Sequence, residues 1–428
     1  MPLEGAGETT KSSFFLHAVY SSGGPSVIIR TKRIPEDGFS RKVLGKPGER
    51  AVFREVRRRE SEGMPVAFSV LVLSPGARST RVAAFCEDVL LWEEELFHEE
   101  HTPACLGGLG TQAEARCEIL ERLLEERPSG GRAFDAVVGR GGVVAPVPGG
   151  FYAVDEALVR HLLRDHPQGH VSNLGGLLAR ALALPRGLPA LMGDPVSAEE
   201  RDPVARLSGL PELPRKALAH TLSLKAVVRA AARELEKPWE ELRVVAVHLG
   251  NGISACAHRD GRMVDLTNPN DAGPFSLDQA GGVPSGDLVR LCFSGAYTLQ
   301  DVRTALVGAG GVMGYLGTDD LASVHARRKA GDGDAERVFS AMAYQVGEEI
   351  GALAAALAGR VDAVLLTGPL AGDPFLVQRV REWVQWIAPV LVFAGGNELG
   401  FLAEGARRVL SGEEPAKRYG DYVVTGEE

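Results

Sequence analysis

Short apolar runs separated by glycine turns follow the same order in two parts of the chain. Three such runs open each part, and they are rich in the branched apolar side chains that strands favour. They lie at residues 66–73, 79–85, 89–94, 242–247, 253–258 and 262–266. In both parts helical spacing follows, and then one more short buried strand, at residues 134–138 and 361–366. This repetition predicts a duplicated α/β architecture with a functional site in the cleft between its halves.

The spacing of apolar residues between these strands predicts the helices. Helices are expected at residues 111–127, 155–165, 171–184, 213–235, 335–357, 374–385 and 398–410, and short strands at residues 188–192 and 390–393. We therefore expect an N-terminal domain over residues 66–200 and a C-terminal nucleotide-binding domain over residues 201–410, with residues 411–428 packing back on the first domain. Residues 1–65 are polar and punctuated by glycine and proline, and they are expected to form a poorly defined extension.

Composition narrows the class of protein. With 428 residues and 45% hydrophobic side chains, the chain can bury a large core spread over roughly two or three domains. Its net charge of −9 argues against recruitment of nucleic acid or of an anionic membrane surface. No apolar run approaches the ~20 residues that span a bilayer, and the start of the chain lacks the pattern of a signal peptide. The five cysteines have no zinc-binding spacing, so we expect reduced thiols in a cytoplasmic protein.

Three of the expected strands end in glycine turns that suit a phosphate. The most informative is Gly-Asn-Gly at residues 250–252, which joins two strands shortly after His248. Glycines on both sides of Asn251 let main-chain N–H groups converge on an anion without interference from a Cβ atom. Turns at residues 74–76 and 367–368 end comparable strands. Each could instead be an ordinary tight turn, but their recurrence in a duplicated architecture favours a nucleotide site.

This arrangement resembles the superfamily of acetate and sugar kinases, heat-shock ATPases and actin, in which two ribonuclease H-like domains enclose a central cleft. More closely, residues 66–428 resemble the butyrate kinases of the acetate kinase family. Besides His220 and Lys225, the strings that carry the resemblance lie at residues 135–142 (DAVVGRGG), 146–150 (PVPGG), 170–175 (HVSNLG), 194–196 (DPV), 205–211 (ARLSGLP), 248–254 (HLGNGIS), 286–295 (GDLVRLCFSG), 361–368 (VDAVLLTG) and 397–399 (NEL).

The resemblance implies phosphoryl transfer between ATP and a short-chain carboxylate, with Mg²⁺ as cofactor. The reaction would be butyrate plus ATP to butyryl phosphate plus ADP, reversible and running towards ATP in the cell. Its transition state spreads negative charge over three equatorial oxygens, so cations and N–H donors must surround the moving group. No Ser, Cys or Asp in these strings is placed as a covalent acceptor, so we expect direct in-line transfer. The resemblance further implies a homodimer and a functional pairing with a phosphotransacylase.

Arg140, His220 and Asp194 are the expected catalytic residues. Arg140 follows a strand and precedes glycines, which suits a guanidinium aimed at the phosphoryl group or the carboxylate, although it could be a surface arginine. His220 lies on a predicted helix, and the resemblance implies that it hydrogen-bonds the transition state; a packed core histidine is the alternative. Asp194 and Glu398 match acidic positions of the family and are the expected Mg²⁺ ligands, unless they only face helix dipoles.

The remaining expected site residues bind the carboxylate or the nucleotide. His170, Asn173 and Gln279 are assigned to the carboxylate, although His170 begins a predicted helix and could equally cap it. The expected nucleotide and phosphate contacts are Ser74, Gly76, Arg78, Ser79, His248, Gly250, Asn251, Gly252 and Gly368. Of these, Gly368 and the helix that follows are assigned to the adenosine end of ATP.

Three turns depart from the butyrate kinase pattern. Residues 74–79 are Ser-Pro-Gly-Ala-Arg-Ser instead of Asn-Pro-Gly-Ser-Thr-Ser, which exchanges an amide donor for a shorter hydroxyl and adds an arginine. Gln279 replaces an arginine, and Pro369 stiffens a turn that is Gly-Gly in the family. Losing one donor aimed at developing charge typically costs about 10²–10³ in turnover. Two alternatives therefore stay open: a non-catalytic homologue that senses nucleotide or acyl phosphate, and a kinase for another small acid.

Overall fold

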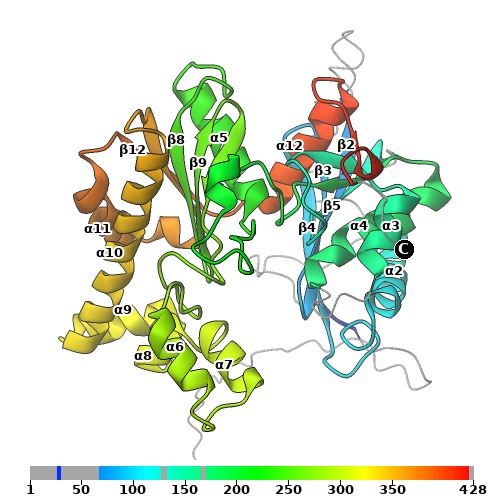
Figure 1. Cartoon of the computed structure of the whole chain (residues 1–428). Helices are drawn as coiled ribbons and strands as arrows, with labels where there is room; N and C mark the ends of the chain where they lie inside the picture. The colour runs from blue at the N-terminus through cyan, green and yellow to red at the C-terminus, as the bar shows by residue number, and fades with distance from the viewer. Residues whose placement is uncertain (1–26, 30–66, 127–132, 165–169, 424–428) are drawn as a thin grey trace, which may run out of the picture.

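Two mixed sheets, each covered by helices, lie side by side in the computed structural model (Figure 1). The structure describes residues 27–29, 67–126, 133–164 and 170–423. Most of the expected N-terminal extension lies outside this range. Its residues 27–29 form a short strand, β1, that pairs antiparallel with β4 at the edge of the first sheet.

The first sheet has eight strands in the order β1-β4-β3-β2-β5-β7-β6-β13. Their bounds are β1 Val27–Ile29, β2 Ser69–Pro75, β3 Ser79–Cys86, β4 Val89–His98, β5 Ala136–Arg140, β6 Phe151–Ala153, β7 Ala190–Gly193 and β13 Lys417–Arg418. The β2-β3-β4 meander is antiparallel, and β5 runs parallel to β2. Because β13 pairs with β6, the end of the chain joins this sheet.

The second sheet has five strands in the order β10-β9-β8-β11-β12. They are β8 Val244–Leu249, β9 Ile253–Arg259, β10 Arg262–Leu266, β11 Ala363–Gly368 and β12 Val390–Ala394. The β8-β9-β10 meander is antiparallel and β11 runs parallel to β8, as β5 does to β2. The same connection therefore occurs twice, which confirms the predicted duplicated α/β fold.

Helices cover both sheets and add a separate group below the second one (Figure 1). The helices near the expected positions are α2 Leu109–Glu126, α3 Glu156–Leu163, α4 Leu174–Ala183, α5 Thr221–Glu234, α10 Gly333–Ala356, α11 Pro374–Val384 and α12 Glu398–Leu410. The helices α6 Ser285–Cys292, α7 Leu299–Leu306, α8 Gly311–Leu316 and α9 Leu321–Lys329 were not predicted from the sequence. Among the described residues, no helix combines the length and apolar character needed to cross a membrane.

Helix α12 follows the second sheet in the chain but packs on the first. Its residues Leu399, Leu402 and Ala406 share a buried cluster with Val70 and Val138 of β2 and β5. Residues up to 410 were expected to belong to the C-terminal domain. We propose instead that this domain ends before α12, so that the chain crosses between the domains a second time just ahead of Glu398.

One predicted helix is too long at its start. The sequence pattern placed a helix at residues 213–235, whereas α5 begins at Thr221 and His220 occupies its N-cap position. The backbone N–H groups of Arg215 and Ala219 donate instead to the carbonyl oxygens of Arg206 and Val196, so contacts with other segments hold this stretch outside the helix. The prediction that His220 lies within a helix is therefore wrong.

Candidate active site

A cavity of about 250 Å³ gathers the predicted catalytic residues from both sheets. Arg140 ends β5, Asp194 follows β7, and Glu398 begins α12. His220 and His248 come from the start of α5 and from β8. The other lining residues are Arg81, Gly141, Val196, Thr221, Leu222, Ser223, Pro369 and Gly396. Residues far apart in the chain therefore meet where the ends of strands from both domains converge.

Arg140 is held in this cavity by a carboxylate. Its Nε lies 3.0 Å from Oε1 of Glu398, and both side chains are only partly buried. The other carboxylate oxygen, Glu398 Oε2, accepts a hydrogen bond of 2.9 Å from the Ser74 hydroxyl. In this structure Ser74, which replaces the family's amide donor, therefore donates its proton to Glu398. The contact ties the turn at residues 74–79, here called the first phosphate loop, to the residue that orients Arg140.

Asp194 is a buried carboxylate with a strained backbone. Its φ of 36° lies in the left-handed region, which aspartate tolerates better than most residues. Gly150 N donates to Asp194 Oδ1 over 2.7 Å. Burial is the largest influence on the pKa of Asp194 and raises it, and the nearby Lys225 opposes that shift only in part. The site thus holds a carboxylate whose negative charge is not fully compensated.

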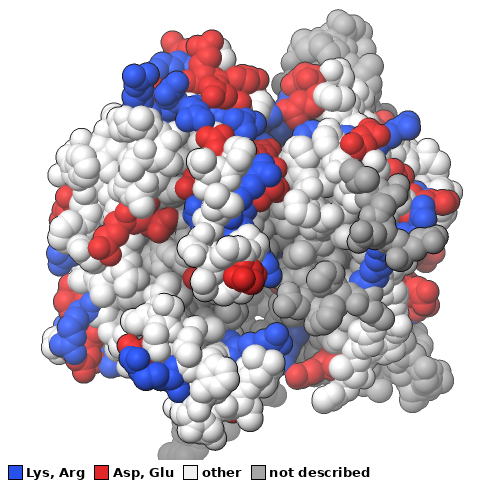
Figure 2. Space-filling model, in the orientation of Figure 1, with Lys and Arg blue, Asp and Glu red and all other residues white. Residues whose placement is uncertain are grey.

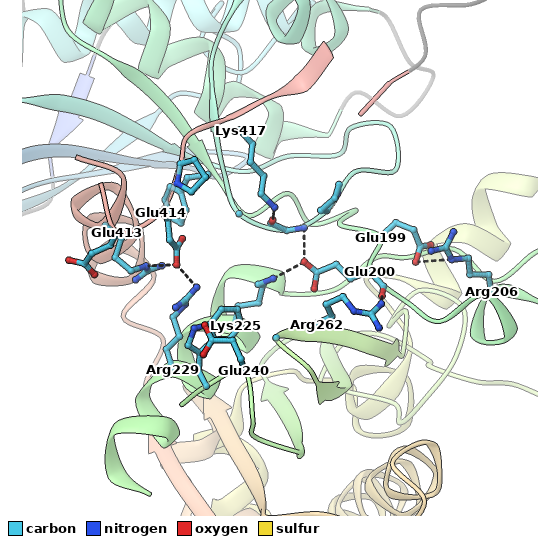
Figure 3. Close-up of a pocket in the computed structure, with 18 residues that line it drawn as sticks. Glu199, Glu200, Arg206, Lys225, Arg229, Glu240, Arg262, Glu413, Glu414 and Lys417 are labelled. Atoms are coloured by element: carbon cyan, nitrogen blue, oxygen red, sulfur yellow. Dashed lines mark hydrogen bonds and ion pairs between the residues drawn. The ribbon is translucent and has the colours of Figure 1, made fainter. Parts of the chain in front are cut away.

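A buried ion pair supports the turn beside Asp194. Oε1 of Glu200 accepts hydrogen bonds from Lys225 Nζ at 2.7 Å and from Gly149 N at 2.8 Å (Figure 3). Lys225 lies on α5, so the pair joins the second domain to the turn that carries Gly150.

A larger cavity of about 780 Å³ opens beside this pair. Its basic side chains include Arg206, Lys225 and Arg229, which are paired with Glu199, Glu200 and Glu414 respectively. Each of these cations is already paired with a carboxylate, as Arg140 is with Glu398.

His220 and His248 stack against each other across the cavity wall. Their ring centroids are 3.9 Å apart and the rings are inclined by 11°. Burial, followed by the positive charge of Arg140, lowers the pKa of His220 to about 4. Burial also lowers the pKa of His248, with smaller contributions from His220 and Arg140. Both rings are therefore neutral at physiological pH and offer hydrogen bonds rather than positive charge.

The glycine turns at residues 250–252 and 367–368 approach other backbone or side chains closely. A Cβ atom on Gly368, whose φ is 92°, would lie 2.4 Å from the carbonyl oxygen of Leu249. A Cβ atom on Gly252 would lie 2.8 Å from Gln279 Oε1. Gly368 therefore requires glycine independently of any ligand, whereas a side chain at position 252 would need Gln279 to move. Asn251 O accepts a hydrogen bond from the Ser276 hydroxyl, which anchors the turn between the glycines.

Three residues assigned to the carboxylate substrate do not line the cavity. His170 occupies the N-cap position of a short 3₁₀ helix, and its Nδ1 accepts from Ser172 N. Asn173 is buried, and its Oδ1 accepts a 2.7 Å hydrogen bond from Val143 N. Gln279 lies against Gly252 and its Oε1 is buried without a hydrogen bond from any described residue. His170 therefore does cap a helix, which was the alternative to substrate binding. For His170, Asn173 and Gln279, a role in binding the carboxylate substrate stays a prediction.

Arg78 points away from the cavity. Its guanidinium forms an ion pair of 2.7 Å with Glu100, and 70% of its side chain is exposed. Because exposed ion pairs contribute little, we expect Arg78→Ser to change kcat and the free energy of unfolding only slightly, by less than about twofold and about 0.5 kcal/mol. Steady-state kinetics and urea unfolding measure both. A large loss of kcat would show that Arg78 turns inward to the phosphates.

Arg116, which the sequence analysis did not single out, holds the first phosphate loop from below. Its side chain is fully buried on α2. The guanidinium donates to the carbonyl oxygens of Gly76, Ala77 and Ser79 over 2.8, 3.0 and 3.2 Å, and Nε donates to Ala104 O over 2.8 Å. The sequence did contain a signal that Arg116 is buried, because it stands at helical spacing among the apolar residues of the buried face of α2.

Buried histidines make stability depend on pH. Burial lowers the pKa of His98, His220 and His258 to about 4, whereas the unfolded value is near 6.5. The unfolded chain therefore binds more protons below pH 6.5, and stability falls as the pH drops from there towards 4. At pH 5 we expect the loss to be about 2 kcal/mol per histidine.

Urea unfolding at pH 7 and pH 5 tests this dependence. His258→Leu removes one of the three groups without touching the cavity residues, so its free energy of unfolding should fall less between the two pH values than that of the parent. Equal pH slopes for the two proteins would contradict the assignment for His258.

On the face shown in Figure 2, acidic and basic side chains are interspersed and no broad basic surface is visible. Within the described part of the chain, no group of three or more His, Cys, Asp or Glu side chains is placed to hold a metal ion alone. A cation at this site would therefore need ligands from substrate or water as well.

Comparisons with known proteins agree with this geometry. The sequence profile described as "Acetokinase family" matches residues 213–402. The chain is 42% identical over 355 residues to a probable butyrate kinase of Clostridium botulinum (strain Eklund 17B / Type B), covering 83% of this chain and all of that protein. It is 39% identical over 353 residues to butyrate kinase 2 of Clostridium acetobutylicum, covering 82% of this chain and 99% of that protein.

Solved structures show the same fold at lower sequence identity. Acetate kinase from Porphyromonas gingivalis superposes with a TM-score of 0.67 at 18% identity, over 80% of this chain and 99% of that one. A propionate kinase from Francisella tularensis gives a TM-score of 0.64 at 16% identity, over 79% and 98%. These two likenesses support the two-domain architecture but say nothing by themselves about substrate.

Proposed function

The chain belongs to the butyrate kinases of the acetokinase family, and on that premise we propose that it transfers a phosphoryl group between ATP and butyrate or a similar short-chain carboxylate. The observation that carries the proposal is the convergence of Arg140, His220 and Asp194 on one cavity between the domains. These residues come from three separate segments of sequence, and the fold brings them to the same place. A cation, a neutral hydrogen-bond donor and a buried carboxylate are the groups that this reaction needs.

The chemistry follows from where each charge lies. We propose that the Arg140 guanidinium binds the equatorial oxygens of the moving phosphoryl group, with Glu398 setting its orientation through the 3.0 Å ion pair. Neutral His220 donates a hydrogen bond to the same group and adds no charge of its own. The carboxylate oxygen of the substrate attacks in line as the bond to the ADP oxygen breaks, so no covalent enzyme intermediate is formed.

The residues of the cavity fit a Mg²⁺ ion. Asp194 and Glu398 both line it and supply hard oxygen atoms, and Mg²⁺ is commonly held by one or two carboxylates together with phosphate oxygens and water. Asp194 is buried, lines the cavity and forms no ion pair with a described residue, and a buried carboxylate of this kind favours a cation beside it. When bound, the ion would neutralise charge on the nucleotide phosphates. We propose Asp194 as its principal protein ligand, because Glu398 already contacts Arg140 and Ser74.

The catalytically inactive sensor is the less favoured alternative. It rested on the departures at Ser74, Ala77, Gln279 and Pro369, but none of these removes a side chain from the set Arg140, His220, Asp194 and Glu398. The high identity with butyrate kinases over their full length also favours an active enzyme.

We further propose a cytoplasmic homodimer that works with a phosphotransacylase and makes ATP from acyl phosphate, as the resemblance to the family suggests.

A hydroxamate assay distinguishes the kinase from the sensor. Purified protein is incubated with ATP, Mg²⁺ and hydroxylamine, and acetate, propionate, butyrate and isobutyrate are compared as acceptors. We expect acyl hydroxamate from butyrate with little from acetate. Strong product from another acid and none from butyrate would favour the kinase for a different acid. Calorimetric binding of ATP without product from any acid would favour the sensor.

A further inference from the structure

We propose that Ser254 is a positioning residue that fixes the tautomer of His220, so that the ring carries its proton on Nε2. The inference rests on the proposed phosphoryl transfer for its functional meaning, but the tautomer itself is a property of the free protein. Ser254 lies on β9, directly opposite His248 of β8 in the sheet register. The residue belongs to none of the glycine turns and does not line the cavity.

The Ser254 hydroxyl contacts His220 twice. Its Oγ accepts a hydrogen bond from the backbone N–H of His220 over 3.1 Å and lies 2.8 Å from Nδ1 of the same residue. The side chain of Ser254 is fully buried. The first contact uses the hydroxyl oxygen as an acceptor, which leaves the hydroxyl proton to be donated elsewhere.

Only one group among the described residues can accept the Ser254 hydroxyl proton, and this acceptor fixes the tautomer of His220. Apart from the backbone N–H, the only hydrogen-bond partner of Ser254 Oγ in the described structure is His220 Nδ1. A fully buried hydroxyl proton without an acceptor is costly, so the hydroxyl donates to Nδ1. A neutral imidazole that accepts at Nδ1 carries its proton at Nε2. The hydrogen bond from Ser254 therefore makes Nε2 a donor.

The surroundings of His220 hold the ring in this state. The stacked ring of His248 restrains its plane at a centroid distance of 3.9 Å. Arg140 from β5 faces the same cavity and disfavours a second proton on His220. Nε2 forms no hydrogen bond with any described residue, yet it is not among the fully buried atoms that lack a partner. It is thus left free to donate to a ligand.

The tautomer matters because the ligand is an anion. An N–H at Nε2 attracts a phosphoryl oxygen, whereas the other tautomer would present a lone pair to negative charge and repel it. Removing the Ser254 hydroxyl leaves Nδ1 without its donor, so both tautomers become populated and the ring loses an anchor. We expect Ser254→Ala to lower kcat by on the order of 10–100-fold, the range typical of groups that orient a functional histidine, with the KM for ATP changed less than about twofold.

The test combines nitrogen NMR of the full-length protein with kinetics. In protein carrying ¹⁵N-labelled histidine, the wild type should show His220 with a protonated Nε2 and an unprotonated Nδ1 at pH 7. Ser254→Ala should shift both signals towards exchange-averaged values. Ser254→Thr, which keeps the hydroxyl, should restore them together with most of the lost kcat. Ser197→Ala removes another buried hydroxyl, bonded to Val144 O, and should leave the His220 signals unchanged.

The outcomes separate this inference from the proposed function. A wild-type spectrum with the proton on Nδ1 overturns the inference whatever the variants do, even if Ser254→Ala fails to fold. Loss of kcat in Ser254→Ala with an unchanged Nε2–H signal also overturns it, because the serine would then act only on structure. If the wild type forms no acyl hydroxamate while its spectrum shows Nε2–H, the proposed function fails and the tautomer assignment stands.

Discussion

Replacing Arg140 with alanine is expected to lower kcat by on the order of 10³-fold while leaving the fold intact. Among the described residues, two arginines line the cavity, Arg81 paired with Glu93 and Arg140 paired with Glu398. Of the two, Arg140 is the one close enough to lower the pKa of His220 and of His248, so Arg140→Ala removes the positive charge nearest the proposed position of the phosphoryl group. Because 29% of the Arg140 side chain is exposed at the end of β5, its removal opens no cavity in the core. Steady-state kinetics in the hydroxamate assay measures the loss.

Two further variants separate charge from geometry in this experiment. Arg140→Lys keeps the charge but loses the planar guanidinium, so it should recover only part of kcat. Glu398→Gln should weaken the orientation of Arg140 and the proposed Mg²⁺ site together, which raises the Mg²⁺ concentration needed for half-maximal rate. Thermal unfolding of each variant should stay within a few degrees of the parent. A kcat for Arg140→Ala within about twofold of wild type would remove Arg140 from the proposed mechanism.

Arg116→Met is expected to lower the free energy of unfolding by about 3 kcal/mol or more. The change removes the donors to the carbonyl oxygens of Gly76, Ala77, Ser79 and Ala104 inside the first domain. Each buried carbonyl left without a donor costs about 1–3 kcal/mol, which the easier burial of methionine offsets only in part. The first phosphate loop should also become mobile, so the KM for ATP should rise.

The same helix supplies a matched control for this variant. Arg122 lies on α2, is 57% exposed and makes only a long contact of 3.9 Å with Glu118. Arg122→Met should therefore change the free energy of unfolding by less than about 0.5 kcal/mol. Urea unfolding of both variants gives the comparison, and fragment-resolved hydrogen exchange over residues 74–80 reports on the loop. Equal effects of the two substitutions would show that Arg116 does not anchor the loop.

Much of this fold was visible in the sequence because local patterns determine it. The six runs of the two meanders are short and bounded by turns, and each forms a strand; the side chains are largely buried in all of these strands except β4. A strand that is buried on both faces appears in the sequence as a short continuous apolar run, whatever its position in the sheet. The order of these runs along the chain then predicted the duplicated arrangement of strands.

The parts that were missed depend on contacts distant in sequence. The placement of α12 on the first sheet depends on Leu399 and Leu402 meeting Val70, more than 300 residues earlier. The short helices α6 and α7 are largely exposed, so their apolar spacing does not mark a buried face, and α9 has little apolar periodicity. His220 was placed within a helix because the helical spacing extends back to residue 213, whereas the N–H groups of Arg215 and Ala219 bond to Arg206 and Val196 elsewhere in the fold.

The candidate site, like the fold, could be predicted from the sequence only in part. Family resemblance supplied the names Arg140, His220, Asp194 and Glu398, and the structure places all four on one cavity. Arg116 contacts carbonyl groups and Ser254 contacts a histidine nitrogen. No spacing rule connects these partners in the sequence, so only the folded chain reveals what the two residues do. Gln279 was assigned to the substrate from its position in a family string, whereas here it packs on Gly252.

A crystal structure of the protein with ADP, Mg²⁺, aluminium fluoride and butyrate tests the central claim most directly. The account predicts the planar fluoride between the ADP phosphates and the butyrate carboxylate, in contact with the Arg140 guanidinium and His220 Nε2, with Mg²⁺ on the Asp194 side. Nucleotide phosphates bound in the large cavity beside Glu200, or anywhere that leaves Arg140 and His220 without contact to them, would contradict it.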